Sequence, residues 1–292
     1  MHAWLTDQIA EGFAATFRIG DTLYDHRSPY QHIRVVTNAH FGRMLVLDDA
    51  VQTTERDEHY YHESLAHLAL CAHPRPRRVL IIGGGDGGLL KEVLRHPVER
   101  VIMVEIDAEV IAISRRFLPA VCRGAFEDAR AAVRIDDGIR FVAEAREAFD
   151  VILVDSPDPK GPALGLYSGD FYDGLRARLA PAGVLAVQSG SPLFQADLLR
   201  TIRALMASRW PVVRTALVTV PTYPGGLWSL TLATSGADPA AISAHVLGAQ
   251  IAGMHLRYYS PALHHAAFEV AAAVVAEIEQ GAPHARAGST LP

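Results

Sequence analysis

The sequence predicts an α/β protein in which a small β-rich domain precedes a doubly wound parallel sheet. From residue 77 onward, short apolar runs alternate with helical patterns, as in parallel strands joined by helices. Before residue 55 the chain has short runs rich in Val, Thr, Tyr and Phe, broken by turn residues. We therefore expect an N-terminal domain over residues 1–55, a main domain over residues 56–280 and a disordered tail over residues 281–292.

The first part of the chain is expected to form several short strands and then a helix. Residues 13–54 contain β-forming runs with Gly, Pro and Asn punctuation. Residues 54–70 have helical spacing, which places Tyr61, Leu65 and Leu68 on one side.

The main domain should contain five strands separated by helices, and then a hairpin. The hairpin, residues 212–220 and 227–234 around the sequence PTYPGG, is not required by a pure dinucleotide-binding fold. The pattern predicts a Rossmann-like sheet of the methyltransferase type, closed by this C-terminal hairpin. The expected strands cover or end at residues 78–83, 100–106, 133–138, 149–155 and 184–189, and the helices cover residues 88–96, 107–118 and 168–180.

Composition and overall sequence pattern argue against several kinds of partner and location. The formal net charge of −5 does not favour nucleic acid or an anionic membrane surface as a partner. No apolar run is long enough to span a membrane, and the N-terminus lacks the pattern of a signal peptide. Two cysteines, Cys71 and Cys122, fit a reducing compartment rather than a disulfide framework. We expect a cytoplasmic enzyme.

A glycine-rich turn at residues 83–88 follows the first expected strand of the main domain. Gly83, Gly85 and Gly88 fit the G-x-G-x-x-G pattern of nucleotide-binding turns. The alternative is a tight turn without a ligand, but so many glycines are costly in backbone entropy. Asp86 lies where a pyrophosphate would otherwise meet the helix N-terminus, so a nucleotide with a cationic centre fits better.

Two further acids follow the next strands. Glu105 ends the second strand and is placed to accept hydrogen bonds from ribose hydroxyls. Asp137 follows the third strand and is placed to accept from an adenine amino group, to cap the following helix, or to do both. Together with Asp86, these acids indicate an adenosyl sulfonium ligand.

The fourth strand ends in an acidic loop. Asp155 and Asp158 lie three residues apart, and strand order should bring them close to Asp86 and Glu105. Four convergent acids repel one another unless a cation binds. The His59–His73 region lacks the spacing of a metal site, so an organic amine fits better than a metal. Alternatively, Asp158 is a turn-forming residue before proline and Asp155 is a helix cap.

Seven blocks extend this interpretation to a family. In order they read FGRMLVLDDAVQTTERDEHYYHE, VLIIGGGDGG, MVEID, IDDG, DSPDPKGPA, PTYPGG and RYYSPALHHAAF. In these blocks the chain resembles the spermidine synthases, the polyamine aminopropyltransferases, over about residues 4–268. The resemblance implies aminopropyl transfer from decarboxylated S-adenosylmethionine, as co-substrate, to a diamine such as putrescine. It also implies no tightly bound cofactor, no metal, and a homodimer or homotetramer.

Site residues can be assigned from the matching motifs. Asp155 resembles the catalytic base, and Tyr61 the hydroxyl that assists it. The implied donor contacts are Gln31, Gln52, Gly83, Gly85, Asp86, Glu105, Ile106, Asp137, Gly138 and Pro162. The implied polyamine contacts are Tyr61, His62, Asp86, Asp155, Asp158, Gln188 and Tyr223.

The chemistry is consistent with these roles. A sulfonium is an activated leaving group, whereas the acceptor amine, with a pKa of roughly 10, must lose a proton before it attacks. A carboxylate within hydrogen-bonding distance can take that proton, and Asp158 is placed to hold the distal ammonium.

The chain also departs from the family pattern at several positions. Pro157 replaces a hydroxyl residue and removes a backbone donor, and Tyr167 replaces a usual Phe. His32 replaces a usual Asp, and Asp49 a usual Gly. Acceptors other than putrescine, namely cadaverine, agmatine or a longer amine, remain open.

Two other functions remain open as well. One is a small-molecule methyltransferase on the same fold, because the fold alone does not fix the reaction. The other is a polyamine-binding or regulatory protein without catalysis.

Overall fold

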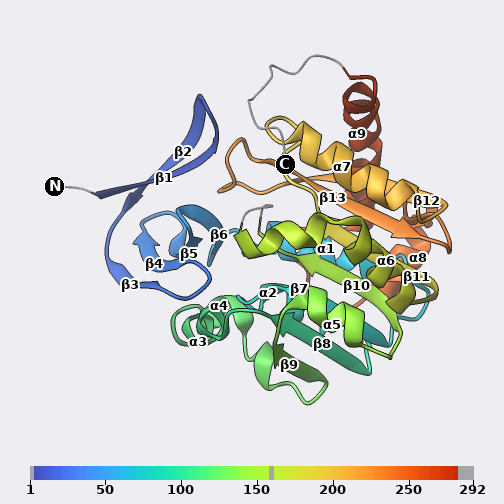
Figure 1. Cartoon of the computed structure of the whole chain (residues 1–292), viewed down its shortest axis with the longest axis horizontal. Helices are drawn as coiled ribbons and strands as arrows, with labels where there is room; N and C mark the ends of the chain where they lie inside the picture. The colour runs from blue at the N-terminus through green and yellow to red at the C-terminus, as the bar shows by residue number, and fades with distance from the viewer. Residues whose placement is uncertain (1–2, 158–160, 282–292) are drawn as a thin grey trace.

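The computed structural model describes residues 3–157 and 161–281. Six antiparallel strands come first and lie together beside the rest of the molecule (Figure 1). β1 and β2 form a two-stranded sheet, and β3 to β6 form a four-stranded sheet in sequential order. Their bounds are Ala3–Ala10, Phe13–Ile19, Thr22–Arg27, His32–Asn38, Gly42–Leu47 and Ala50–Thr54.

The larger part is built on a seven-stranded sheet with the order β12-β13-β11-β10-β7-β8-β9. β7 to β11 are parallel to their neighbours, whereas β13 runs antiparallel to β11 and pairs with β12 as a hairpin. The predicted doubly wound sheet closed by a C-terminal hairpin is therefore confirmed. The strands are Arg78–Gly83, Arg100–Glu105, Ala131–Ile135, Phe149–Asp155, Leu179–Gln188, Val212–Thr219 and Leu227–Thr234.

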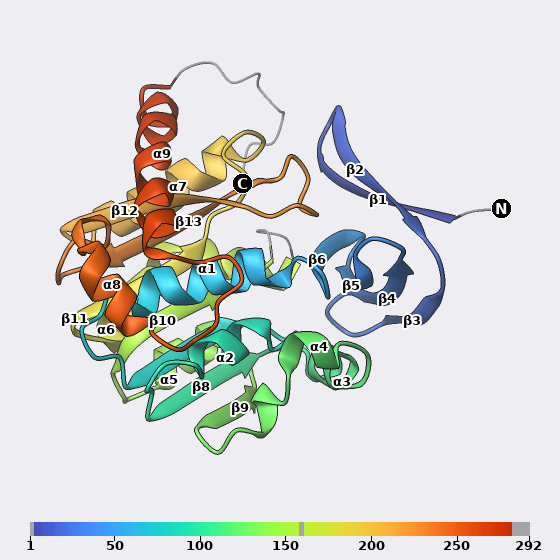
Figure 2. The same ribbon diagram turned by 180° about the vertical axis from the view of Figure 1, so that it is seen from behind.

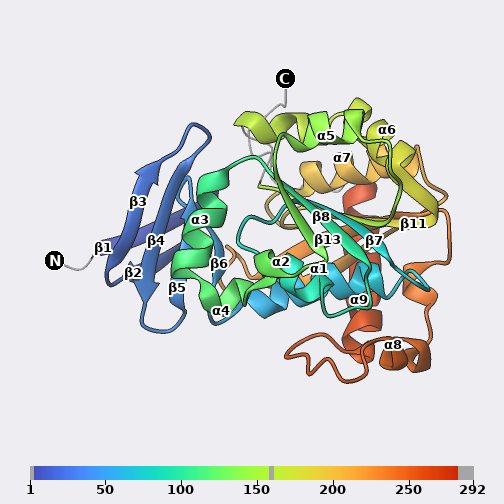
Figure 3. The same ribbon diagram turned by 90° about the horizontal axis from the view of Figure 1, so that it is seen from below.

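Helices cover both faces of this sheet (Figure 3). α5, α6 and α7 lie on one face, and α1, α2, α8 and α9 lie on the other. The α-helices α1 to α9 are Glu58–Leu70, Gly88–Val93, Ala108–Phe117, Pro119–Cys122, Gly138–Glu144, Gly169–Arg178, Ala196–Ala207, Ala244–Gln250 and Pro261–Glu279, and the 3₁₀ helices η1 to η3 are Ala125–Glu127, Gly161–Tyr167 and Pro239–Ala241.

The strands are apolar throughout because both faces of the sheet are buried. In β7, Val79 and Ile81 belong to the core under α1 and α2, whereas Leu80 and Ile82 belong to the core under α5 to α7. Alternate residues of a strand point to opposite faces, so each core receives every second side chain. This explains why the sequence shows continuous apolar runs here rather than alternation.

The strand order reverses next to β7, and this locates the site. From β7 the chain proceeds to β8 and β9, then crosses to β10 on the other side of β7. The carboxyl ends of β7 and β10 therefore open a crevice between diverging connections, where ligands bind in open α/β sheets. β7 ends at Gly83 and β10 ends at Asp155, which are paired in register.

The helix expected at residues 54–70 is present as α1, which begins at Glu58. α1 is buried almost all round, including Glu58, His62 and Glu63. Polar side chains are tolerated there because they have partners. The Glu63 carboxylate, for example, accepts hydrogen bonds from three consecutive backbone amides of residues 257–259 at 2.8–2.9 Å. Figure 2 shows α1 running between the N-terminal strands and the C-terminal segments.

The N-terminal strands pack on the main part through an apolar cluster. Ile33, Val35 and Leu45 of β4 and β5 contact Val110 and Ile113 of α3. The predicted boundary between residues 55 and 56 lies between β6 and α1, and the division into domains stays a prediction. β1 has no counterpart in the sequence analysis. The expected tail lies outside the described residues, apart from residue 281.

Within the described part of the chain, no helix is long and apolar enough to cross a membrane. Cys71 and Cys122 are both free and buried.

Candidate functional site

A cavity of about 540 Å³ opens at the carboxyl ends of the central strands. The predicted site residues whose side chains the structure describes all line it. Asp158 lies outside the described residues, and the side chain of Pro162 is also outside that description. The structure thus brings Gln31, Gln52, Tyr61, His62, Gly83, Gly85, Asp86, Glu105, Ile106, Asp137, Gly138, Asp155, Gln188 and Tyr223 to one cavity.

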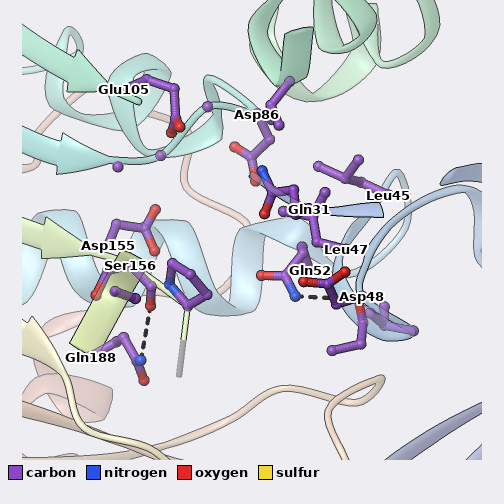
Figure 4. Close-up of a pocket in the computed structure, with 18 of the residues that line it drawn as sticks. Gln31, Leu45, Leu47, Asp48, Gln52, Asp86, Glu105, Asp155, Ser156 and Gln188 are labelled. Carbon is purple, nitrogen blue, oxygen red and sulfur yellow. Dashed lines mark hydrogen bonds between the residues drawn. The ribbon is translucent and has the colours of Figure 1, made fainter. Parts of the chain in front are cut away.

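Three carboxylates from three connections point into the same space (Figure 4). Asp86 comes from the turn after β7, Glu105 from the end of β8 and Asp155 from the end of β10. Asp86 and Glu105 are each only 8% exposed, and Asp155 is half-buried. Like charges in a poorly solvated site repel one another and favour a bound cation.

The glycine turn places Asp155. Gly83 has φ +84°, and a Cβ there would lie 1.9 Å from the backbone oxygen of Asp155. The Gly84 amide donates to that same oxygen at 3.1 Å. Only glycine permits this approach of the two strand ends. The turn therefore holds the end of β10 as well as shaping a nucleotide site.

Asp155 is held by Tyr61. The Tyr61 hydroxyl of α1 donates to Asp155 Oδ1 at 2.7 Å. Burial and the negative charge of Asp86 raise the pKa of Asp155 to about 6, although His62 and the Tyr61 hydrogen bond oppose the rise. Such a carboxylate is ionised at neutral pH and still basic enough to accept a proton. Burial also raises the pKa of Tyr61 well above its usual range, so this hydroxyl stays a donor.

Glu105 is the other strongly perturbed acid. Burial raises its pKa to about 7, and the hydrogen bond from the Asp107 amide, at 2.9 Å to Oε1, opposes the rise. Gly85 leaves room for it, since a Cβ there would lie 2.9 Å from Glu105 Oε2. The carboxylate is placed to accept from hydroxyl groups of a ligand lying over the turn.

Asp137 caps α5, as the sequence analysis allowed. Its Oδ1 accepts from the Ile139 amide at 2.8 Å, and the residue also lines the cavity. Gly138 follows directly, and a Cβ there would lie 2.5 Å from Ile82 Cγ2. This glycine lets α5 start against the end of β7.

The opposite wall comes from the N-terminal strands. Gln31 Nε2 donates to Asp107 Oδ2 at 3.0 Å, which ties the N-terminal part to the connection after β8. The Gln52 backbone oxygen accepts from the Tyr223 hydroxyl at 2.9 Å. Residues 6–9 of β1 also line the cavity, and the sequence analysis missed them because no motif marks that strand.

Gln188 lies at the end of β11 with its amide fully engaged. Its Nε2 donates to Ser156 O at 2.9 Å (Figure 4). Its Oε1 accepts from Trp228 Nε1 at 3.1 Å. It is 4% exposed. Gln188 therefore fixes the wall of the cavity, and Trp228 is a second lining residue that the sequence analysis did not single out.

The two departures from the family loop meet in space. The Tyr167 hydroxyl donates to the Pro157 backbone oxygen at 3.0 Å and lies 3.3 Å from Gln188 Nε2, which donates to it. The extra hydroxyl of Tyr167 thus ties the loop after β10 to the cavity wall.

Among residues 3–157 and 161–281 no group of three or more His, Cys, Asp or Glu side chains is arranged to hold a metal ion.

Comparison with known proteins assigns the family. The sequence model described as the spermine/spermidine synthase domain matches residues 58–240, and the one described as the spermidine synthase tetramerisation domain matches residues 3–55. The chain belongs to the spermine/spermidine synthase family. As a member of this family, it is an enzyme.

Close relatives and solved structures agree with this assignment. The chain is 44% identical to a polyamine aminopropyltransferase of Desulforudis audaxviator, over 92% of this chain and 96% of the relative. It is 43% identical to one of Moorella thermoacetica, over 91% and 93%. A solved spermidine synthase in complex with the transition state analogue AdoDATO superposes with a TM-score of 0.88, at 33% identity, over 94% and 96% of the two chains. The spermidine synthase of Thermotoga maritima gives 0.86 at 32% identity, over 94% and 95%.

Proposed function

We propose that this chain transfers the aminopropyl group of decarboxylated S-adenosylmethionine to putrescine, giving spermidine and methylthioadenosine. The broader statement, a polyamine aminopropyltransferase, rests on the family and on relatives of that name. The observation that carries the finer proposal is the cavity in which Asp86, Glu105 and Asp155 converge. Both substrates are cationic and both would relieve the repulsion among these acids.

In this proposal the nucleoside of the donor lies over the glycine turn. Glu105 accepts from the ribose hydroxyls, Asp137 faces the adenine, and Gln31 closes the site from the N-terminal side. Asp86 faces the terminal ammonium of the donor. That end bears no carboxylate in the decarboxylated compound, so Asp86 would select it over S-adenosylmethionine by charge.

The acceptor would lie between Asp155 and the wall formed by Gln188 and Tyr223. Asp155 takes a proton from the acceptor ammonium, with Tyr61 fixing the carboxylate. The free amine then attacks the methylene next to sulfur, so a C–N bond forms and the C–S bond breaks. The electron pair of the C–S bond goes to sulfur, so methylthioadenosine leaves as a neutral thioether. The proton that Asp155 took up is then released to solvent. In-line placement of nitrogen, carbon and sulfur supplies the rest of the rate enhancement.

A product assay tests the proposal directly. The protein is incubated with decarboxylated S-adenosylmethionine and, in separate reactions, putrescine, cadaverine, agmatine and spermidine, and products are measured by mass spectrometry. We expect spermidine and methylthioadenosine, with putrescine preferred. Release of S-adenosylhomocysteine from S-adenosylmethionine would identify a methyltransferase instead. Binding of polyamine without any product would identify a binding protein.

We also propose that the chain works as a homo-oligomer assembled through residues 3–55, the region that matches the tetramerisation domain. Light scattering of the purified protein measures its mass directly. A protomer mass at working concentrations would refute this part without affecting the proposed reaction.

A further inference from the structure

Next to the cavity, α1 and α2 carry a row of buried charges for which the proposed reaction gives no role. Glu58 Oε1 lies 2.7 Å from Lys91 Nζ, and Lys91 Nζ lies 3.1 Å from Glu92 Oε1. Glu92 Oε2 continues the row to Arg95 Nε at 2.7 Å. The side chains of Glu58, Lys91 and Glu92 are at most 9% exposed. Buried charges of this kind are costly unless each has a partner.

His62 joins this row to the cavity. Its Nδ1 lies 2.9 Å from Glu58 Oε2, one helical turn earlier on α1, and its Nε2 lies 3.4 Å from Asp86 Oδ2. The side chain of His62 is 2% exposed. A ring with a carboxylate at each nitrogen satisfies both only when both nitrogens carry protons.

Gly88 gives the ring its place. A Cβ at Gly88 would lie 2.2 Å from His62 Cε1 and Nδ1. The backbone amide of Gly88 donates to Asp86 Oδ1 at 2.7 Å. The last glycine of the G-x-G-x-x-G pattern therefore accommodates an imidazole of the protein, while its amide fixes Asp86.

The pairing of charges indicates the protonation state of the His62 ring. Lys91 faces Glu58 and Arg95 faces Glu92, so each of these carboxylates has a cation. Asp86 has His62 as its facing cation among the described side chains. His67 and His96, hydrogen-bonded to each other at 2.8 Å, lie at the Glu92 end, where His67 Nε2 is 3.4 Å from Glu92 Oε2. A cationic partner for Asp86, like those of Glu58 and Glu92, therefore requires an imidazolium at position 62.

The acid–base properties agree with this geometry. Burial alone would lower the pKa of His62, but the charges and hydrogen bonds of Asp86 and Glu58 outweigh it and raise the pKa to about 10. Burial likewise opposes the ionised form of Glu58, but His62 and Lys91 lower its pKa to about 2. The charge on His62 also acts on Asp155, whose pKa it lowers against the effect of Asp86.

We propose that Glu58 and Lys91 are positioning residues: they hold His62 as an imidazolium directed at Asp86, and its positive charge favours the carboxylate form of Asp155. This inference rests on the proposed function. In this arrangement His62 has no free lone pair with which to accept a hydrogen bond from an ammonium group. Its effect on the substrates is electrostatic and passes through Asp86, in contrast to the direct amine contact that the family resemblance implies.

The state of His62 can be measured without any variant. In wild-type protein without ligand, ¹⁵N NMR of the His62 ring at neutral pH should show both nitrogens protonated. A neutral ring would overturn the inference, whether or not the enzyme transfers aminopropyl groups. Assignment is made with His62→Gln, in which the signal disappears.

Glu58→Gln then tests the positioning role, because it keeps the shape of the side chain and removes its charge. We expect the acid limb of the kcat/KM profile to move to higher pH by about one unit, which lowers the ratio of kcat/KM at about pH 6 to its alkaline plateau by roughly fivefold. The His62 ring should lose its second proton near neutral pH.

Glu92→Gln is the matched control, since Glu92 is equally buried and touches Lys91 but not His62. It should lower the unfolding temperature and leave the acid limb in place. Equal scaling of kcat/KM at every pH in Glu58→Gln would show a merely structural role and overturn the inference. If wild-type protein forms no spermidine at any pH, the proposed function fails, and the NMR result still decides the state of His62.

Discussion

Asp155 is under opposing influences. Burial and Asp86 favour its protonated form, whereas His62 and the Tyr61 hydrogen bond favour the carboxylate, and the resulting pKa is about 6. A base must be deprotonated to act, so kcat/KM should rise with pH through about 6 and level off above it. Asp155→Asn should keep the fold and the affinity for methylthioadenosine but lower kcat by about 10²-fold or more.

Steady-state kinetics and calorimetry check this prediction together. Tyr61→Phe is the companion variant, since it leaves the carboxylate in place and removes the hydroxyl that fixes Oδ1. Its loss of kcat should be smaller than that of Asp155→Asn. Near-wild-type turnover in Asp155→Asn would remove this residue from the role of base.

Asp86 should determine the choice of donor. One of its oxygens is fixed by the Gly88 amide and the other faces His62, so the carboxylate is held in place. Asp86→Asn should weaken binding of decarboxylated S-adenosylmethionine by several-fold or more and narrow its preference over S-adenosylmethionine. Methylthioadenosine lacks the ammonium group, so its dissociation constant should change much less.

Calorimetry with the three compounds at moderate salt measures these differences. If the substitution weakens all three equally, Asp86 only shapes the turn. Asp86 would then have no part in selecting the donor.

Among the connecting elements, the turn after β7 carries the largest steric constraint. Gly83→Ala would meet Asp155 O at 1.9 Å and would also adopt φ +84°. The left-handed conformation costs about 1–2 kcal/mol, and the overlap should add roughly 1–3 kcal/mol. Gly253→Ala is the control, because Gly253 has φ +78° and no atom of the described residues lies within 4 Å of its Cβ position. Thermal unfolding should show a clearly larger loss for Gly83→Ala; equal losses would mean that the strand ends can separate freely.

The loop after β10 should depend on Tyr167. Its hydroxyl joins the Pro157 oxygen to Gln188, so Tyr167→Phe removes a tie worth about 1 kcal/mol. We expect KM for the acceptor to rise by roughly fivefold, with the dissociation constant of methylthioadenosine almost unchanged. Tyr172→Phe is the control, since the buried Tyr172 hydroxyl has no hydrogen-bond partner among the residues that the structure describes. The prediction is wrong if both variants behave alike in the acceptor titration.

The elements differ in how far the sequence predicts them. The strands β7, β8 and β10 follow from apolar runs that end in glycine or acid, because both faces of the sheet demand apolar side chains. The full burial of α1 could not be predicted, since Glu58, His62 and Glu63 appear polar in a local pattern. Their partners, Lys91, Asp86 and the amides of residues 257–259, are distant in sequence.

The site shows the same division between local and distant information. Its acids were predictable because each follows a strand whose end must lie at one edge of the sheet. The cavity wall from β1 was not, because strand order says nothing of how a separate antiparallel unit docks. The absence of a side chain at position 88 is likewise explained by His62, which lies on another helix.

At the scale of the whole molecule, β1 and β2 stand apart from the other two sheets. They form a separate two-stranded sheet, which is not stable on its own in water. Leu5 and Phe17 pack on the apolar face of β4 to β6. Trp4, in contrast, is 62% exposed. An exposed tryptophan on a marginal sheet is expected to be covered in an assembly.

Trp4→Glu should therefore weaken the proposed assembly, because it places a charge where a second copy would bury an indole. We expect light scattering to show a lower mass than for wild type at equal concentration. Val270→Glu is the control: Val270 is 58% exposed on α9, outside the residues that match the tetramerisation domain, and its substitution should leave the mass unchanged. Residues 6–9 of β1 line the cavity. Dissociation of the assembly should therefore disturb the cavity wall and raise KM for the substrates. If Trp4→Glu keeps the wild-type mass, the contact between copies lies elsewhere on residues 3–55 or on another surface.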